Sequence, residues 1–424
     1  MARLIINGRH RVGGLFQPSG NKNAVLPMLA ASLLTEDKIV LHNVPVIQDV
    51  LTMLAILEDL GVSIDRRGGT LALCAASIRK KRLKSELCAR VRSSILFAGP
   101  MAARHGRVTI YPPGGDVIGR RRLDSHFIGL RALGIEIAGS DHFTFRAKKL
   151  RGGKILLDEA SVTATENVIM AATLAGGQTT IFNAACEPHV QDLCFLLNKM
   201  GAKISGLGTN LLRIEGVAEL HGAEHRVSQD YIEIGSFLAA AAVTGGELTI
   251  HGIDESHIAP ILRPFHILGA DLRLENKTLK LVPLKNLKLR VEHDLAIPKI
   301  EDGPWPAFPS DLMSIAIVLG TQTTGTALFF EKMFESRMYF VERLIDMGAK
   351  IVQCDPHRVV VIGPSRLHAI PLSSPDIRAG MAMLIAALGA KGTSVIHNAE
   401  VIDRGYERIE ERLRALGADI NREK

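Results

Sequence analysis

The stretch LTMLAILEDLGVSID, residues 51–65, decides the fold, because it joins an amphipathic helix to an alternating strand through Gly61. Glycine readily adopts the left-handed conformation that ends many helices, and the alternation after it is typical of a strand with one buried face. The pattern recurs along the chain, with its glycine at Gly134, Gly201, Gly269, Gly348 and Gly417. The sequence is therefore built from repeats of about 70 residues.

A second kind of helix alternates with the first and is apolar nearly all round. A helix of this kind has to be buried, so we expect these helices inside the molecule, with the amphipathic helices and the sheets around them. The copies begin near Asn23 (NAVLPMLAASLL), Ser93 (SSILFAGPMAA), Thr165 (TENVIMAATLA), Ile232 (IEIGSFLAAAAV), Asp311 (DLMSIAIVLG) and Ile377 (IRAGMAMLIAAL).

Each repeat is predicted to run strand, buried helix, strand, loop, amphipathic helix, strand. Six repeats in 424 residues form two groups of three, and the length also favours more than one domain. The chain should cross between the domains near residues 229–231, after the third repeat. The first strand, residues 4–6, precedes the first buried helix, so a second crossing near Gly20 is possible.

The composition excludes several classes of protein. Hydrophobic residues make up 47% of the chain and charged residues 22%, which rules out a disordered or collagen-like chain. The five cysteines never form a C-x-x-C pair, so the sequence indicates neither a disulfide framework nor a zinc ribbon, and a reducing cytoplasm is expected. The uncharged stretches 167–186 and 312–330 contain Gly, Thr and Gln, which favours helix, turn and strand over a membrane span.

The basic run RKKRLK, residues 79–84, and a net charge of +7 raise the question of nucleic-acid binding. No aromatic residues interleave with this run. We therefore interpret it as a solvated turn and expect no nucleic-acid partner.

Unusual polar residues occur at two recurrent places, which could meet in one cleft between the domains. Helix N-termini would add partial positive charge there. At the start of the buried helices lie Lys22 with Asn23, Arg92, Ser161 to Thr165, Asp230 with Glu233, Ser310 with Asp311, and Asp376 with Arg378. In the loops after the central strands lie Asp116 with Arg121, Glu187, Asp254 with His257, Glu335 with Arg337, and Asp403 with Arg404.

The chain has neither a P-loop nor a convincing dinucleotide-binding motif, so anion binding would depend on these Arg and Lys residues. The planar fork of arginine matches carboxylate and phosphate oxygens two at a time. Taken singly, each such residue is better explained as a helix cap or a surface ion pair. The recurrence of five arginines and a lysine at equivalent positions weakens that explanation for the set.

Five segments, in this order, resemble the enolpyruvyl transferase family, and within it the UDP-N-acetylglucosamine 1-carboxyvinyltransferases. The resemblance covers essentially the whole chain. The segments are SGNKNAVLP (19–27), PPGGDVIGRRRLDSH (112–126), PAFPSD (306–311), FESR (334–337) and IDRGYERIE (402–410).

The resemblance implies an α/β fold of the inside-out α/β barrel type, with two domains of three βαβαβ-type repeats each. The domains would be 22–230 and 1–21 plus 231–424, with the first strand in the C-terminal half. It also implies transfer of the enolpyruvyl group of phosphoenolpyruvate to the 3-hydroxyl of UDP-N-acetylglucosamine, a step of peptidoglycan synthesis in the cytoplasm. No cofactor, metal, nucleic acid or membrane would take part, and the oligomeric state stays open.

Roles follow from the resemblance position by position. The catalytic residues would be Lys22, Asp116, Asp311 and Arg404, with Asp311 taking the proton of the sugar hydroxyl. Phosphoenolpyruvate would be bound by Lys22, Asn23, Arg92, Arg121, Arg337, Arg378 and Arg404. The UDP-sugar would be bound by Asn23, Arg92, Arg121, Arg122, Leu123, Asp124, Ser125, Ser161, Val162, Thr163, Asp311 and Met333.

Asp116 stands where most members carry the cysteine that protonates the methylene carbon of phosphoenolpyruvate and that fosfomycin alkylates. Acting as an acid would require a protonated Asp116, which burial or a nearby carboxylate would have to favour. The resemblance thus implies fosfomycin resistance.

Other departures are Arg122, Thr163, Ser336 and the LMSI that follows Asp311. They leave open another UDP-sugar or shikimate 3-phosphate as acceptor, and a non-catalytic sugar-nucleotide-binding or RNA-binding homologue.

Overall fold

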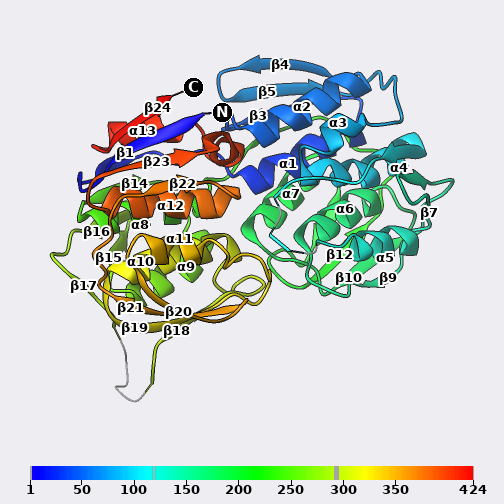
Figure 1. The fold of residues 1–424 in the computed structure, drawn as a ribbon. Helices are drawn as coiled ribbons and strands as arrows, with labels where there is room; N and C mark the ends of the chain where they lie inside the picture. The colour runs from blue at the N-terminus through cyan, green and yellow to red at the C-terminus, as the bar shows by residue number, and fades with distance from the viewer. Residues whose placement is uncertain (1, 117, 120, 291–295, 424) are drawn as a thin grey trace. The chain divides into compact units, whose positions relative to one another are not determined.

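The structure is a computed structural model that describes all residues except 1, 117, 120, 291–295 and 424, so two positions of the loop 112–126 lie outside the described residues. The chain forms two compact units (Figure 1). Unit 1 comprises Met1–Pro18, Val117–Arg120 and Asp230–Lys424, and unit 2 comprises Ser19–Asp116 and Arg121–Gln229. The domain limits 22–230 and 1–21 plus 231–424 stay a prediction.

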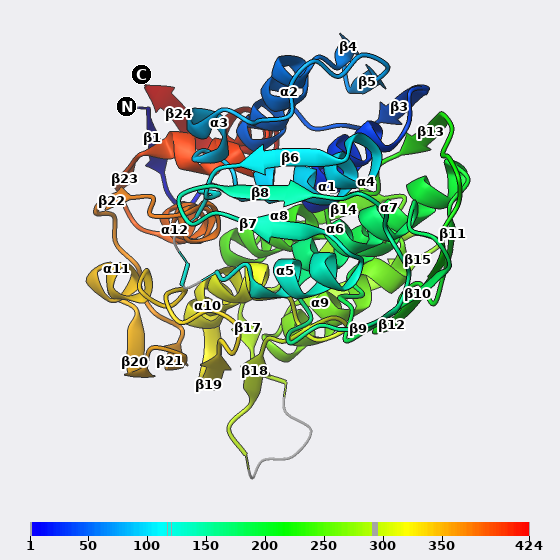
Figure 2. The same ribbon diagram turned by 90° about the vertical axis from the view of Figure 1, so that its right-hand side faces the viewer.

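Unit 2 places three sheets around apolar helices that pack on one another. The sheets are β13(Ala223–Arg226)-β3(Lys38–His42)-β5(Thr70–Cys74)-β4(Ser63–Arg67), β11(Lys203–Ser205)-β12(Leu211–Glu215)-β10(Gln178–Phe182)-β9(Lys154–Leu156), and β6(Arg107–Ile110)-β8(Phe143–Arg146)-β7(Glu136–Ala138), which Figure 2 shows in cyan. The inner helices are α1(Lys22–Ala31), η2(Arg92–Phe97) with α4(Ala98–His105), and α6(Val162–Ala172). The outer helices are α2(Gln48–Leu60), α5(Asp124–Ala132) and α7(Pro188–Lys199), and two short helical turns are η1(Ser32–Leu34) and α3(Ser85–Cys88).

Unit 1 repeats this plan with three sheets of its own. They are β22(Pro371–Ser373)-β23(Thr393–His397)-β1(Arg3–Asn7)-β24(Asp419–Glu423), β15(Asp271–Glu275)-β16(Thr278–Val282)-β14(Leu248–His251)-β2(Gly14–Phe16), and β17(Leu287–Lys288)-β19(Thr323–Phe330)-β21(Arg358–Gly363)-β20(Lys350–Asp355), with β18(Lys299–Glu301) beside β19. The helices are α8(Tyr231–Thr244), α9(Glu255–Ile267), η3(Ser310–Leu312) leading into α10(Met313–Gln322), α11(Val341–Asp346), α12(Ile377–Gly389), η4(Ala399–Arg404) and α13(Ile409–Ala415).

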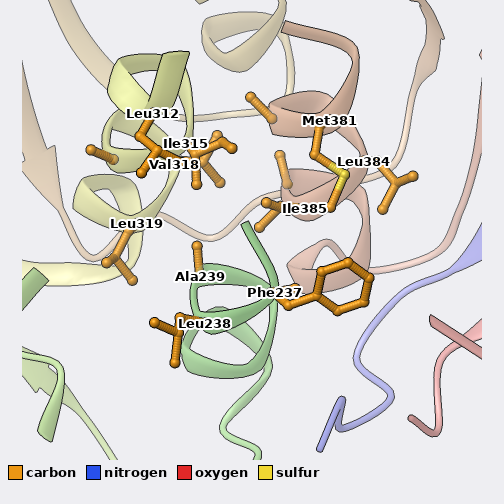
Figure 3. Packing of buried hydrophobic residues seen from close by; sticks show 14 of the residues in the cluster. Phe237, Leu238, Ala239, Leu312, Ile315, Val318, Leu319, Met381, Leu384 and Ile385 are labelled. Carbon is orange, nitrogen blue, oxygen red and sulfur yellow. The ribbon is translucent and has the colours of Figure 1, made fainter. Parts of the chain in front are cut away.

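The predicted inner helices form the centre of unit 1. Helices α8, α10 and α12 pack on one another, and Figure 3 shows their side chains filling the space between them. Phe237, Ile315 and Leu384 are fully buried there. Burying a side chain of this size stabilises the fold by roughly 1.5–3 kcal/mol. A helix that is enclosed on all sides is therefore expected to carry apolar residues all round. The prediction of buried inner helices is confirmed.

The predicted glycine pattern is also confirmed. All six glycines that follow the outer helices have positive φ angles, from +90° at Gly269 to +108° at Gly61. A side chain with a Cβ is disfavoured in this region of φ, which explains why the same residue recurs where each outer helix ends.

The first strand, β1, pairs antiparallel with both β23 and β24 in unit 1, as the resemblance implied. In unit 2, β13 is the last strand before residue 229. It pairs parallel with β3 and forms the edge of the sheet that contains β3, β5 and β4. None of the sheets closes into a barrel among the described strands.

Two helices differ from the sequence prediction. The inner helix expected from Ser93 is a 3₁₀ helix up to Phe97, because the N–H of Gly99 donates to Oδ1 of Asn167 at 2.6 Å and Pro100 has no N–H to donate. The outer helix expected from Tyr406 begins only at Ile409, because Arg408 has a left-handed φ of +42°.

The stretches 167–186 and 312–330 form helix, turn and strand, as predicted. Among the described residues, no helix combines the length and the apolarity that crossing a bilayer requires.

Candidate active site

In unit 1 the candidate site centres on the carboxylate of Asp311. Asp311 lies in η3, at the start of an inner helix, and its side chain is 29% exposed. Nη2 of Arg337 donates to Oδ1 at 3.0 Å. Nε and Nη2 of Arg378 donate to Oδ2 at 3.1 and 2.8 Å. The structure thus brings together three of the predicted site residues around one partly accessible carboxylate.

Arg378 is held in place by more than Asp311. Asp376 caps α12 by accepting the N–H groups of Arg378 and Ala379 at 2.8 and 2.9 Å. Nη1 of Arg378 donates to the hydroxyl of Tyr406 at 3.1 Å, and that hydroxyl lies 2.8 Å from the hydroxyl of Ser236 on α8. Burial opposes the charge of Arg378, but Asp311, Tyr406 and Asp230 together outweigh it, so the pKa of Arg378 is raised.

The FESR loop carries Arg337, whose side chain is 2% exposed. The backbone N–H of Ser336 in this loop donates to the carbonyl of Ile118 at 3.3 Å. Gly119 has a φ of +134°, which favours glycine, and a Cβ there would lie 2.5 Å from Oε2 of Glu335. Met333 is 40% exposed in the segment that precedes the loop.

Arg404 is the last residue of η4 and is half-buried. Its neighbour Asp403 pairs with Arg422 of the C-terminal strand β24 at 2.7 Å, and Arg422 also binds Glu410 at 2.7 Å. This clamp fixes the short helix that carries Arg404. Asp403 therefore has a structural role, which the sequence pattern did not distinguish from a role in binding.

In unit 2 the first cation is Lys22, the first residue of α1. Asn21 caps this helix by accepting the N–H groups of Asn23 and Ala24 at 2.8 and 3.2 Å. Lys22 is 8% exposed, and its Nζ lies 2.7 Å from Oδ2 of Asp49 in the first turn of α2. Helix capping and this ion pair together hold the amine at the N-terminus of α1.

Arg92 and Arg121 form the second part of the site in unit 2. Arg92 begins η2, and its Nη2 donates to the carbonyl of Arg122 at 3.0 Å. Burial and the charge of Arg121 lower the pKa of Arg92 to about 10, against the opposing effect of Glu159. Like charges that lower each other's pKa favour binding of an anion between them.

Asp116 lies half-buried in the loop that follows β6. Gly114 and Gly115 bring this loop against the start of η2. A Cβ at Gly114 would lie 1.7 Å from the carbonyl oxygen of Ala89, and one at Gly115 would lie 3.1 Å from Cβ of Arg92. The two glycines therefore let the loop pack against Ala89 and Arg92, and Asp116 is the residue that follows this contact.

The structure reveals one residue of this region that sequence reasoning missed, His126. Its Nδ1 accepts from Nδ2 of Asn167 at 3.1 Å, so its Nε2 donates to the hydroxyl of Thr163, also at 3.1 Å. Burial and the charges of Arg92 and Arg121 lower the pKa of His126 to about 3. His126 is thus a neutral residue that orients Thr163; it ends the segment 112–126, but the sequence pattern assigned it no role.

The remaining predicted residues lie at two helix starts. Ser125, in the first turn of α5, donates its hydroxyl to Asp158, and Arg122 and Asp124 form an exposed ion pair at 2.9 Å. Leu123 is the residue before α5. Ser161 precedes α6, which begins with Val162 and Thr163.

Several predicted polar residues turn out to be structural. Asp230 and Asp254 cap α8 and α9 with their side chains. Glu233 is bound by Arg412 through both of its carboxylate oxygens. The expectation that the two groups of site residues line one cleft stays a prediction.

Comparison with known proteins adds a second line of evidence. The family model of EPSP synthase (3-phosphoshikimate 1-carboxyvinyltransferase) matches residues 6–413. A UDP-N-acetylglucosamine 1-carboxyvinyltransferase of Treponema denticola is 53% identical over 423 residues, which cover 99% of this chain and 99% of the relative. Those of Bradyrhizobium diazoefficiens and Borreliella burgdorferi are 53% and 50% identical and also match over nearly their whole lengths, 98% and 100%.

Solved structures show the same fold at lower identity. The enolpyruvyl transferase NikO from Streptomyces tendae gives a TM-score of 0.87 at 21% identity, covering 99% of this chain and 98% of that one. EPSP synthase from Acinetobacter baumannii gives 0.77 at 17% identity, with 100% of each chain covered. The predicted enolpyruvyl transferase fold is therefore confirmed.

Proposed function

The chain belongs to the EPSP synthase family of enolpyruvyl transferases, and we propose that it transfers the enolpyruvyl group of phosphoenolpyruvate to the 3-hydroxyl of UDP-N-acetylglucosamine, with release of phosphate. The observation that carries this proposal is the full-length identity of 50–53% to relatives that bear this activity in their names. The reaction would serve peptidoglycan synthesis. A cytoplasmic location fits it, and the free thiols of Cys74, Cys88, Cys194 and Cys354 are compatible with a reducing compartment.

The inventory of the site suits this chemistry. Joining an alcohol to the carbon that carries the phosphate needs a base for the hydroxyl and an acid for the methylene carbon. Fixed cations are needed for the carboxylate and the phosphate of phosphoenolpyruvate. Asp311 supplies the candidate base, Asp116 the candidate acid, and the arginines and Lys22 the cations.

The reaction balances in two steps. In the first, the sugar oxygen bonds to C2 of phosphoenolpyruvate, Asp311 accepts the hydroxyl proton, and Asp116 donates a proton to C3. In the second, the C2–O bond to phosphate breaks and C3 loses a proton, which restores the double bond. Asp311 is suited to the first step because two guanidinium groups orient its carboxylate while 29% of it stays accessible.

We assign binding roles on the same basis. Lys22, Arg121 and Arg404 would hold phosphoenolpyruvate, and Arg92, Arg337 and Arg378 would complete the cationic surroundings. Asn23, Asp311 and Met333 would contact the amino sugar. The UDP group would lie along Arg121 to Ser125 and Ser161 to Thr163, where the N-termini of α5 and α6 offer unpaired N–H groups to a diphosphate.

Thr163 and Arg122 do not argue for another acceptor. The Thr163 hydroxyl is occupied by His126, and Arg122 points its charge to Asp124. Both departures from the common pattern are thus accommodated by partners within unit 2. The preference for UDP-N-acetylglucosamine over shikimate 3-phosphate therefore rests on the full-length relatives.

A phosphate-release assay tests the proposal. The purified protein with phosphoenolpyruvate should release phosphate when UDP-N-acetylglucosamine is added, without added metal. Release of phosphate with shikimate 3-phosphate and none with the UDP-sugar would show instead that shikimate 3-phosphate is the acceptor. No release with any acceptor would favour a non-catalytic homologue.

A further inference from the structure

Unit 1 contains a pair of buried acids to which the proposed reaction assigns no role. Glu331 follows β19 directly and Asp302 follows β18, and these two strands pair in parallel. Glu331 is 0% exposed and Asp302 is 2% exposed. The parallel register sets Glu301 beside Phe330, so the two acids that follow are neighbours, and Asp302 raises the pKa of Glu331.

The acid pair joins the two segments that carry the Asp311 site. Oε1 of Glu331 accepts the N–H groups of Met333 and Phe334, both at 3.1 Å. The hydroxyl of Ser310, next to Asp311, donates to Glu331 at 2.9 Å. Oδ1 of Asp302 accepts the N–H of Lys332 at 2.5 Å. The pair thus fixes both the segment before Asp311 and the segment before the FESR loop.

Geometry indicates that this pair holds a proton. Two ionised carboxylates side by side, away from water, would repel each other strongly. Oδ2 of Asp302 is buried and has no hydrogen-bond donor among the residues that the structure describes. A proton on Glu331 would supply that donor. Burial and Asp302 also raise the pKa of Glu331 to about 9, although Arg337 opposes them.

The position of Arg337 depends on the charge of Glu331. Nε of Arg337 lies 3.6 Å from Oε2 of Glu331, which is too far for a hydrogen bond. Nε and Nη1 have no hydrogen-bond partner within the described part of the chain. An ionised Glu331 would attract this guanidinium through a charge-assisted bond and would compete with Asp311 for it.

We propose that Glu331 and Asp302 are positioning residues that share one proton, and that neutral Glu331 leaves the guanidinium of Arg337 to Asp311 and to the substrate anion. This inference rests on the proposed function, because it gives Arg337 a substrate to bind. It also links the acid pair to the candidate base Asp311, because the proton on the pair determines whether Arg337 binds Asp311 or Glu331.

The charged groups around Glu331 set the sign of the pH dependence. Asp302 and Arg337 face its carboxyl group, and Asp311 lies beyond Arg337. His357 contacts the backbone of Glu331: its ring lies 2.7 Å from the Glu331 carbonyl, and its own carbonyl accepts the N–H of Glu331 at 2.8 Å. Lys332 pairs with Glu301 at 2.9 Å. Glu331 is neutral below its pKa of about 9, so substrate binding should be intact at neutral pH and weaken as the pH rises through 9.

Three variants test the proposal through the Michaelis constant for phosphoenolpyruvate. Asp302→Asn removes the neighbouring carboxylate, so Glu331 should ionise at lower pH and draw Arg337 away. At pH 7.5 the constant should rise on the order of tenfold or more, the value of one hydrogen bond to a charged group, and the alkaline loss should move to lower pH. Glu331→Gln should abolish that alkaline loss. The double variant Asp302→Asn/Glu331→Gln should recover the affinity that Asp302→Asn alone loses.

The rescue separates positioning from mere structural support. An equal rise in the Michaelis constant in Asp302→Asn and in the double variant would overturn the proposal. Infrared difference spectra between wild type and Glu331→Gln test the proton without any turnover. The wild type should show the carbonyl stretch of a protonated carboxyl at pH 7.5 and lose it above pH 9. Its absence at pH 7.5 would overturn the proposal even if phosphate release confirms the proposed function, and its presence would support the shared proton even if release fails.

Discussion

The two units provide cations in opposite ways. In unit 1, Arg337 and Arg378 are almost fully buried and both pair with Asp311. In unit 2, Arg92 and Arg121 lie close enough for the charge of one to lower the pKa of the other. Unit 1 therefore holds its guanidinium groups by internal counter-charges, whereas the arginines of unit 2 gain most when an anion arrives. The difference suggests that unit 1 shapes the base and that unit 2 supplies the pull on phosphate.

The largest effect should come from breaking the network of unit 1. Arg378→Ala leaves the carboxylate of Asp311 with the guanidinium of Arg337 and removes the donor that Arg378 gives to the Tyr406 hydroxyl. Removing one partner of a buried ion pair typically costs about 3–5 kcal/mol. Chemical denaturation should show this loss, and turnover should fall with it. Arg366→Ala, at an exposed position of the same unit, is the control; equal stability of the two variants would contradict the ion-pair account.

Lys22→Ala tests a cation of unit 2 that also pairs with the buried Asp49, so its effects on binding and on folding are measured separately. If Lys22 pairs with a desolvated anion in the transition state, kcat/KM for phosphoenolpyruvate should fall. The fall should correspond to a loss of transition-state stabilisation on the order of 2–5 kcal/mol. Arg404→Ala should behave alike. Lys84→Ala, which removes an exposed ion pair with Asp59, is the control. Activity of Lys22→Ala within a fewfold of wild type would argue against the assigned role.

Asp116 tests the acid that unit 2 contributes. Asp116→Asn fills the same space without an acidic proton, so turnover should fall by roughly 100-fold, the typical contribution of a general acid. Asp116→Cys should keep activity and become sensitive to fosfomycin, because a thiolate opens an epoxide far faster than a carboxylate does. Normal turnover of the Asn variant, or covalent labelling of wild-type Asp116 by fosfomycin, would show that the role has been misread.

His126 gives the smallest expected effect, on the pH dependence of stability. Its folded-state pKa of about 3 lies below the ordinary value of 6.5, so the unfolded state binds a proton first as the pH falls. The stability linked to His126 is therefore complete above pH 6.5 and declines as the pH falls towards 3, by about 2 kcal/mol between pH 7 and pH 5. His126→Gln should flatten this decline in denaturant titrations. The exposed His10→Gln should not, and an unchanged slope in His126→Gln would refute the assignment.

Local pattern was enough to predict much of the fold. Each outer helix ends at a glycine whose left-handed backbone is a local requirement, and each inner helix is apolar on all sides because it has no exposed face. Asp311 and Arg337 could be named from the segments 306–311 and 334–337, and Arg378 from its place at the start of an inner helix. Their convergence, however, depends on the tertiary fold.

The parts that sequence reasoning missed depend on contacts between distant segments. His126 orients Thr163 across 37 positions of sequence, and Tyr406 reaches Arg378 across 28. The Asp302–Glu331 pair exists only because β18 and β19 are neighbours, and neither acid stands in an informative motif. Asp230 and Asp403 were candidates for the site in the sequence, but in the structure they cap a helix and pair with Arg422, respectively. An acid with such a role cannot be told from a binding acid by sequence alone.

The central claim is the identity of the acceptor and of the bond that forms, and product analysis tests it most directly. The protein would be incubated with ¹³C-labelled phosphoenolpyruvate and UDP-N-acetylglucosamine, and the product examined by NMR. The account predicts the labelled carbon in a vinyl ether on the 3-oxygen of the amino sugar, with phosphate released in equal amount. Phosphoenolpyruvate left intact in the presence of the UDP-sugar, or a vinyl ether formed only in a parallel incubation with shikimate 3-phosphate, would contradict it.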